Sequence, residues 1–122
     1  MSKVFVYGTL KKGYCNHSCL EDSPLVGKGK SVPRFRMFTN GYFPMVIRTF
    51  NTEGVQVTGE VYEVSPETLA RLDRLEGVSY GHYRRDACAV RFEDGYQVTA
   101  YVYVFCQNVF SLTPVLSGEW TE

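Results

Sequence analysis

The sequence predicts an α+β fold: a small, mixed but mostly antiparallel β-barrel with one or more flanking helices. Runs rich in β-branched and aromatic residues recur along the chain and outnumber the helical patterns. The one convincing helical pattern lies in the middle of the chain, at residues 66–76. Strands with a single helix packed on them favour a sheet curled into a small barrel. A chain of 122 residues can bury a core of its own, so we expect one domain over residues 1–122.

Strand-like segments in the first half of the chain occupy residues 3–8, 24–32, 34–39 and 42–49. The first of these is short and apolar and ends in a glycine-containing turn. Asn40-Gly41 divides the last two apolar runs, as a hairpin turn would. Pro44 cannot donate a hydrogen bond to a neighbouring strand, so we expect an edge strand or an irregular strand there.

Strand-like segments in the second half occupy residues 55–64, 83–92 and 96–105. A helix is expected between the first two, because Ser65 can cap it, Pro66 can occupy its first position and Gly77 can end it. The strand at 96–105 carries Val and Ala on one face and mainly Tyr on the other, so we expect both faces to contact protein. The closing piece, residues 111–120, is expected to be short and irregular or helical.

Composition argues against two classes of partner. Acidic and basic residues balance at 13 each, without the basic excess that is usual in nucleic-acid-binding proteins. The small basic clusters at Lys11-Lys12, Lys28 to Lys30 and Arg84-Arg85 are expected to be solvated edges. No segment approaches the about 20 apolar residues of a membrane span, and the first residues lack a signal-peptide core. We therefore expect a cytoplasmic protein that binds neither nucleic acid nor membrane.

The four cysteines are expected to be free thiols, as is usual for a protein of the cytoplasm. Cys88 and Cys106 lie in strand-like stretches and are expected to be small buried hydrophobic residues. Cys15, His17 and Cys19 form a C-x-H-x-C pattern, which lacks the two-residue gap of ordinary zinc sites and has no second ligand pair downstream. We expect no metal site.

A carboxylate lies on the apolar face of the predicted helix. Leucines mark that face at Leu69, Leu72 and Leu75. At about 100° per residue, Glu76 falls inside the same arc, whereas Arg71 and Arg74 point toward water. Glu76 either reaches solvent at the helix end or pairs with an arginine such as Arg85, or it is partly desolvated, with a raised pKa suited to proton transfer. The residues alone leave these alternatives open.

Other polar groups are candidates for the same site. Gly8 follows the first strand and allows a sharp turn with outward-facing N–H groups, which can hold a carboxylate or an oxyanion. The stretch lacks the spacing of a nucleotide-phosphate loop. Tyr83 can direct a hydroxyl into a pocket, and Arg85 can pair with Asp73 or with a substrate carboxylate. Asp73 itself is expected to bond to backbone or to an arginine.

In combination these segments resemble the γ-glutamylcyclotransferase superfamily, in particular its small γ-glutamylamine cyclotransferase-like branch. The resemblance runs in order through "VFVYGTLKKGYCNH", "VTGEVYEVSPETLARLDRLEG", "YRRDACAV", "AYVYVF" and "SGEW". It implies a mixed barrel with flanking helices, Glu76 as the catalytic acid/base, and a structural role for His17. The implied substrate-binding residues are Tyr7, Gly8, Thr9 and Leu10, which bind the γ-glutamyl part largely through backbone amides, and the pocket tyrosine Tyr83.

The resemblance also implies a reaction, in which a γ-glutamyl amine or amino acid closes on itself to 5-oxoproline and releases the free amine, with no cofactor. The expected partner is thus a small γ-glutamyl molecule. A catalytically silent member of the fold that binds a small ligand is the alternative, and a protein-interaction module that uses some of the 18 aromatic residues is a third possibility. The leaving amine and the oligomeric state stay open. Residues 40–46 and 107–118 are expected to line the leaving-amine pocket.

Overall fold

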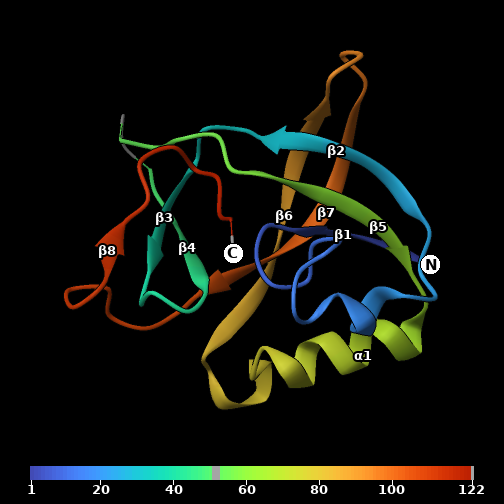
Figure 1. Cartoon of the computed structure of the whole chain (residues 1–122), viewed down its shortest axis with the longest axis horizontal. Coiled ribbons are helices and arrows are strands. Elements are labelled where there is room, and N and C mark those ends of the chain that lie inside the picture. Colours follow the sequence, from blue (N-terminus) through green and yellow to red (C-terminus); the bar gives the residue numbers. More distant parts are fainter. Residues whose placement is uncertain (51–52, 122) are drawn as a thin grey trace.

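The strands form two sheets in the computed structural model, which describes residues 1–50 and 53–121 (Figure 1). The larger sheet is a closed barrel in the order β1-β5-β2-β6-β7. Its strands are β1 (Ser2–Val6), β2 (Leu25–Ser31), β5 (Thr58–Val64), β6 (Tyr83–Phe92) and β7 (Gln97–Phe105). The pair β1 and β7 is parallel, and the other neighbouring pairs are antiparallel. The predicted mixed, mostly antiparallel barrel is confirmed.

The second sheet lies to one side of the barrel and has the order β4-β3-β8 (Figure 1). Its strands are β3 (Phe35–Thr39), β4 (Pro44–Arg48) and β8 (Thr113–Pro114). The hairpin predicted at Asn40-Gly41 joins β3 to β4, and Pro44 opens an edge strand, as predicted. The closing piece was expected to be irregular or helical, and β8 corrects this. Two residues are too few to show the alternation by which a strand is recognised in a sequence.

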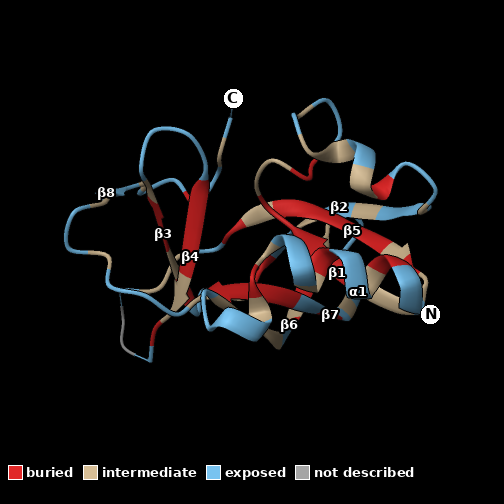
Figure 2. Cartoon of the chain, turned by 90° about the horizontal axis from the view of Figure 1, so that it is seen from below, coloured by how far each residue is buried: buried red, intermediate tan, exposed pale blue. Residues whose placement is uncertain are grey.

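The helix α1 (Pro66–Leu75) begins and ends as predicted. Ser65 Oγ accepts a hydrogen bond from the N–H of Thr68 at 3.1 Å, and Pro66 occupies the first turn. Leu72 is fully buried against the barrel, while the outer face of the helix is exposed (Figure 2). Leu75 is 47% exposed, so the predicted apolar face is not buried at its end. In the described ranges no helix is long and apolar enough to cross a membrane.

Two clusters of buried side chains meet at the barrel wall. One fills the barrel, and the other lies between the barrel and α1. Because side chains alternate along a strand, β7 contributes Val102 and Val104 to the first cluster and Tyr103 to the second. The prediction that both faces of β7 contact protein is correct there. It is wrong at Thr99, which is exposed.

Two sequence-based expectations about single side chains are wrong. Lys11 is not a solvated edge, because its side chain is buried and its ammonium donates a hydrogen bond to the carbonyl of Trp120 at 2.6 Å. Cys106 is exposed, because β7 ends one residue earlier and the strand no longer directs this side chain inward. Cys88 is buried as predicted, and all four cysteines are free thiols.

Candidate active site

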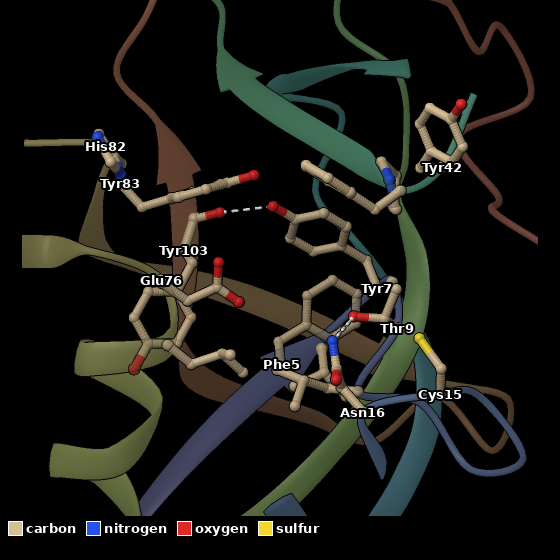
Figure 3. Close-up of a pocket in the computed structure, with 16 residues that line it drawn as sticks. Phe5, Tyr7, Thr9, Cys15, Asn16, Tyr42, Glu76, His82, Tyr83 and Tyr103 are labelled. Atoms are coloured by element: carbon tan, nitrogen blue, oxygen red, sulfur yellow. Dashed lines mark hydrogen bonds between the residues drawn. The ribbon is translucent and has the colours of Figure 1, made fainter. Parts of the chain in front are cut away.

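A cavity of about 490 Å³ opens where the barrel, the end of α1 and the β3–β4 turn meet. Five segments of the chain line this cavity: residues 5–10 with 15–16, the turn 42–44, residues 75–76, residues 82–83, and Tyr103 on β7. The fold therefore brings together Glu76, Tyr83 and residues 7–10, which the resemblance assigns to the site. Figure 3 shows the cavity with Glu76 on one side and Thr9, Cys15 and Asn16 on the other.

Glu76 is the C-cap of α1, and its carboxylate points from the helix end into the cavity (Figure 3). Its backbone N–H donates to the carbonyl of Leu72 at 2.9 Å, which holds the residue on the last helical turn. Burial raises the pKa of the carboxyl to about 7, because the charged form is desolvated. The described residues offer this carboxylate no ion-pair partner. Glu76 is thus suited to exchange a proton near neutral pH.

Arg85 does not neutralise Glu76, which was one of the two alternatives left open by the sequence. Its Nε donates instead to Asp73 Oδ1 at 2.9 Å, so the predicted pairing of these two residues is confirmed. Neither Asp73 nor Arg85 is among the described residues that line the cavity. A direct contact between Arg85 and a ligand carboxylate in this cavity is not part of the arrangement.

The turn after β1 faces Glu76 across the cavity. Three of its carbonyl groups accept hydrogen bonds from the loop that follows: Gly8 from Lys11 N at 3.0 Å, Thr9 from Asn16 N at 2.8 Å, and Leu10 from His17 Nδ1 at 2.9 Å. These bonds use carbonyl oxygens, so they do not consume the N–H groups of residues 8–10. An arrangement of consecutive N–H groups beside a cavity can hold an anion.

Three tyrosines form the wall next to Glu76. Tyr7 is buried, and its hydroxyl donates to the carbonyl of Tyr103 at 2.8 Å (Figure 3). Burial raises the pKa of Tyr7, and the nearby Tyr83 and Glu76 raise it further. Burial also raises the pKa of Tyr83, with Glu76 adding to the effect. These hydroxyls stay protonated and can donate or accept hydrogen bonds at neutral pH.

Sequence reasoning missed several lining residues. Tyr103 was placed on a strand but not in the site, because nothing distinguishes it from the eight other tyrosines before the barrel is closed. Asn16 was likewise missed, although its Nδ2 donates to Thr9 Oγ1 at 2.9 Å. The predicted leaving-amine segment 40–46 does supply lining residues. Of the described lining residues none comes from 107–118.

The C-x-H-x-C stretch is organised around hydrogen bonds within the chain. A carbonyl can only accept, so His17 must carry its proton on Nδ1 to bond to Leu10, and its ring lies 5.7 Å from that of Tyr62. These contacts support the structural role that was expected of His17. Over residues 1–50 and 53–121, no three His, Cys, Asp or Glu side chains are grouped as a metal ion would need.

Comparison with known proteins identifies the family of the chain. Residues 4–122 match the family described as gamma-glutamyl cyclotransferase, AIG2-like. A Methanocaldococcus jannaschii protein named provisionally as a gamma-glutamylcyclotransferase is 37% identical over all of this chain and 98% of its own length. The gamma-L-glutamyl-butirosin B gamma-glutamyl cyclotransferase of Niallia circulans is 34% identical over all of this chain and 77% of its own. The crystal structure of a mouse AIG2-like protein is 29% identical with a TM-score of 0.84, over 99% of this chain and 88% of the mouse chain. The chain described here belongs to the AIG2-like gamma-glutamyl cyclotransferase family.

Proposed function

We propose that this protein converts a γ-glutamyl amine or γ-glutamyl amino acid to 5-oxoproline and free amine, with Glu76 as the general acid/base. One observation carries the proposal: a carboxylate without an ion-pair partner in the described structure lines a small cavity together with the turn of residues 8–10. The turn supplies a site for the α-carboxylate of the γ-glutamyl group. Glu76 then lies on the side where the proton of the α-ammonium must be removed.

The reaction follows from the substrate itself. The α-amine attacks the γ-carbonyl carbon, forming a C–N bond that closes a five-membered ring, and the amide C–N bond to the leaving amine breaks. In water the α-amine is mostly protonated and the amide is a poor leaving group. Ionised Glu76 takes one proton from the ammonium and passes it to the departing nitrogen. It then passes on the second proton that the ring nitrogen loses after the attack, so the amine departs as an ammonium and the carboxylate ends as it began. Binding in the cavity holds amine and carbonyl at high effective concentration.

A pKa of about 7 suits both halves of this cycle. A carboxyl group with the ordinary pKa of 4.5 would be a weak base for an ammonium and a weak donor to a leaving amine at neutral pH. Tyr83, which faces the same space and keeps its proton, is a candidate hydrogen-bond donor to the γ-carbonyl oxygen as negative charge develops there.

The test is turnover of a panel of γ-glutamyl amides, followed by the appearance of 5-oxoproline. We expect turnover by the unaltered protein and a loss of about 10²-fold or more in kcat/KM for Glu76→Gln. The kcat/KM of the unaltered protein should rise with pH through about 7, since the ionised form of Glu76 is the base.

Glu67→Gln is the matched control, because this glutamate is exposed in the first turn of the same helix. It should keep its activity. Full activity of a folded Glu76→Gln protein would contradict the mechanism. If the unaltered protein turned over no compound of the panel but its melting temperature rose on adding one, the alternative of a catalytically silent binder would be supported.

A further inference from the structure

A cross-strand pair on β6 and β7 forms hydrogen bonds to α1, the helix that ends at Glu76. Arg85 and Tyr103 lie directly opposite each other in the sheet. Both donate to the same oxygen of Asp73, the Arg85 Nε at 2.9 Å and the Tyr103 hydroxyl at 2.7 Å. The Cζ of the guanidinium also lies over the ring of Tyr101, 4.8 Å from its centroid, which adds a cation–π contact to the sheet. Two charge-assisted hydrogen bonds from a rigid sheet therefore restrain the helix at Asp73.

Asp73 lies three residues before Glu76, so the two side chains are neighbours on the last turn of α1. The same Tyr103 that bonds to Asp73 through its hydroxyl accepts the Tyr7 hydroxyl through its backbone carbonyl at 2.8 Å. Tyr103 thus contacts α1 through its hydroxyl, and through its backbone carbonyl it contacts Tyr7, which precedes the turn at residues 8–10. A displacement of this residue would alter both sides of the cavity.

The charges of the pair also matter, because Glu76 has no ion-pair partner of its own among the described residues. The titratable groups that line the cavity with Glu76 come from several segments and are Tyr7, Cys15, Tyr42, His82, Tyr83 and Tyr103. Asp73 on α1 and Arg85 on β6 form an ion pair outside the cavity. In the pair, Asp73 is negative and Arg85 positive. While the two are joined, their effects on a nearby carboxylate largely cancel.

We propose that Asp73, Arg85 and Tyr103 form a positioning triad, which fixes the last turn of α1 on the sheet and presents a net charge of zero behind Glu76. Asp73 and Arg85 do not line the cavity, so they act on the reaction through Glu76 and not on the substrate. The inference rests on the proposed function of Glu76. It follows that Asp73 and Arg85 have opposite effects on the pKa of Glu76.

The experiment compares Asp73→Asn, Arg85→Gln and the double variant. Asp73→Asn leaves the arginine uncompensated, which favours ionised Glu76, so the rising limb of kcat/KM against pH should move to lower pH. Arg85→Gln leaves the aspartate uncompensated and should move the limb to higher pH. We expect each shift to be about half a pH unit or more, and the double variant to return toward the unaltered protein. Limbs that coincide, or that move in the same direction, would overturn the triad.

Arg84→Gln is the control, because Arg84 is an arginine on the opposite face of β6 with its own ion pair to Asp86 at 3.1 Å. It should leave the limb unchanged. Tyr103→Phe keeps the ring and the backbone carbonyl, and should lower kcat about tenfold with little change in KM. A rise in KM alone would contradict a positioning role for its hydroxyl.

A second measurement separates failure of the triad from failure of the proposed function. NMR titration of the Glu76 carboxyl reads the same opposite shifts without any turnover. If those shifts occur but Glu76→Gln keeps full activity, the proposed mechanism fails and the electrostatic part of the triad stands. If Glu76→Gln is inactive and the titration of Glu76 does not move, the triad alone fails.

Discussion

Glu76 owes its position to the residue that follows it. Gly77 has a φ of +65°, in the left-handed region where glycine is favoured, and this ends α1 directly after the Glu76 C-cap. A Cβ at this position would lie 2.7 Å from His82 Nδ1. A larger residue here would therefore require both a strained backbone and a shift of the His82 side chain. The turn at Gly77 leaves the Glu76 side chain at the cavity and keeps it from reaching solvent along the helix axis.

The unusual pKa of Glu76 has a cost in stability with a definite sign. Folding raises this pKa from the ordinary 4.5 to about 7, so the folded protein binds the proton more tightly than the unfolded chain. Below pH 4.5 the group is protonated in both states and costs nothing. As the pH rises from 4.5 to about 7, the free energy of unfolding falls. The loss is complete above pH 7 and amounts to at most about 3 kcal/mol.

Replacing Glu76 by Gln should therefore raise the melting temperature at pH 8 and have little effect at pH 4.5. The reason is that the amide cannot ionise and avoids the desolvation cost. Thermal unfolding at the two pH values measures the difference, with Glu67→Gln as the exposed comparison on the same helix. Equal effects of Glu76→Gln at both pH values would show that burial does not disfavour the ionised group.

At the scale of elements, the β3–β4 turn is built to hold apolar side chains at the rim of the cavity. Asn40 Oδ1 accepts hydrogen bonds from the N–H of Tyr42 at 2.9 Å and of Phe43 at 3.1 Å. Tyr42 is 82% exposed and yet lines the cavity. Pro44, two residues further on, lies against Gly8, since a Cβ on Gly8 would be 2.8 Å from the Pro44 Cγ. The turn therefore forms a wall beside the proposed γ-glutamyl position.

Tyr42→Ser should raise KM for γ-glutamyl amides with a bulky apolar leaving amine by about tenfold more than for the γ-glutamyl methylamide. The larger amine reaches the rim and loses apolar contact there, while the methyl group does not extend as far. Steady-state kinetics on the two substrates tests this. Tyr96→Ser removes an exposed tyrosine outside this cavity and should change neither constant. Equal effects on both amides would place the leaving amine elsewhere.

At the scale of the whole molecule, the C-terminal segment connects the barrel to the loop after β1. The carbonyl of Gly118 accepts from Thr58 N on β5 at 2.9 Å. Two residues later the carbonyl of Trp120 accepts from Lys11 Nζ at 2.6 Å and from the Tyr14 hydroxyl at 3.3 Å. Trp120, near one end of the chain, thus holds the loop that follows residues 8–10, near the other end.

Lys11→Met should lower the free energy of unfolding by about 1–2 kcal/mol and raise KM, because a charge-assisted hydrogen bond to the carbonyl of Trp120 is lost next to residues 8–10. Urea denaturation and steady-state kinetics measure the two effects. Lys12→Met is the matched control, since the neighbouring lysine is exposed and should tolerate the change. If both variants had the same free energy of unfolding and the same KM, the hydrogen bond from Lys11 to Trp120 would not contribute to stability or to substrate binding.

Local patterns were sufficient for most of the secondary structure. The strand periodicity, the Asn40-Gly41 turn, and the capping residues around α1 each act within a few positions in sequence. The same holds for Glu76, whose place on the apolar face follows from helical geometry. The expectations that were wrong, Lys11 and Cys106 among them, concern side chains whose surroundings come from remote segments.

The sequence by itself determined the barrel, its helix and the candidate carboxylate, because each depends on short-range periodicity or on an ordered set of motifs. Only the tertiary structure decided that Arg85 pairs with Asp73 and leaves Glu76 without an ion-pair partner in the described chain. It also brought Tyr103 and the β3–β4 turn to the cavity. The physical reason is that strand pairing and chain closure set these contacts across a dozen or more positions, a distance over which periodicity carries no information.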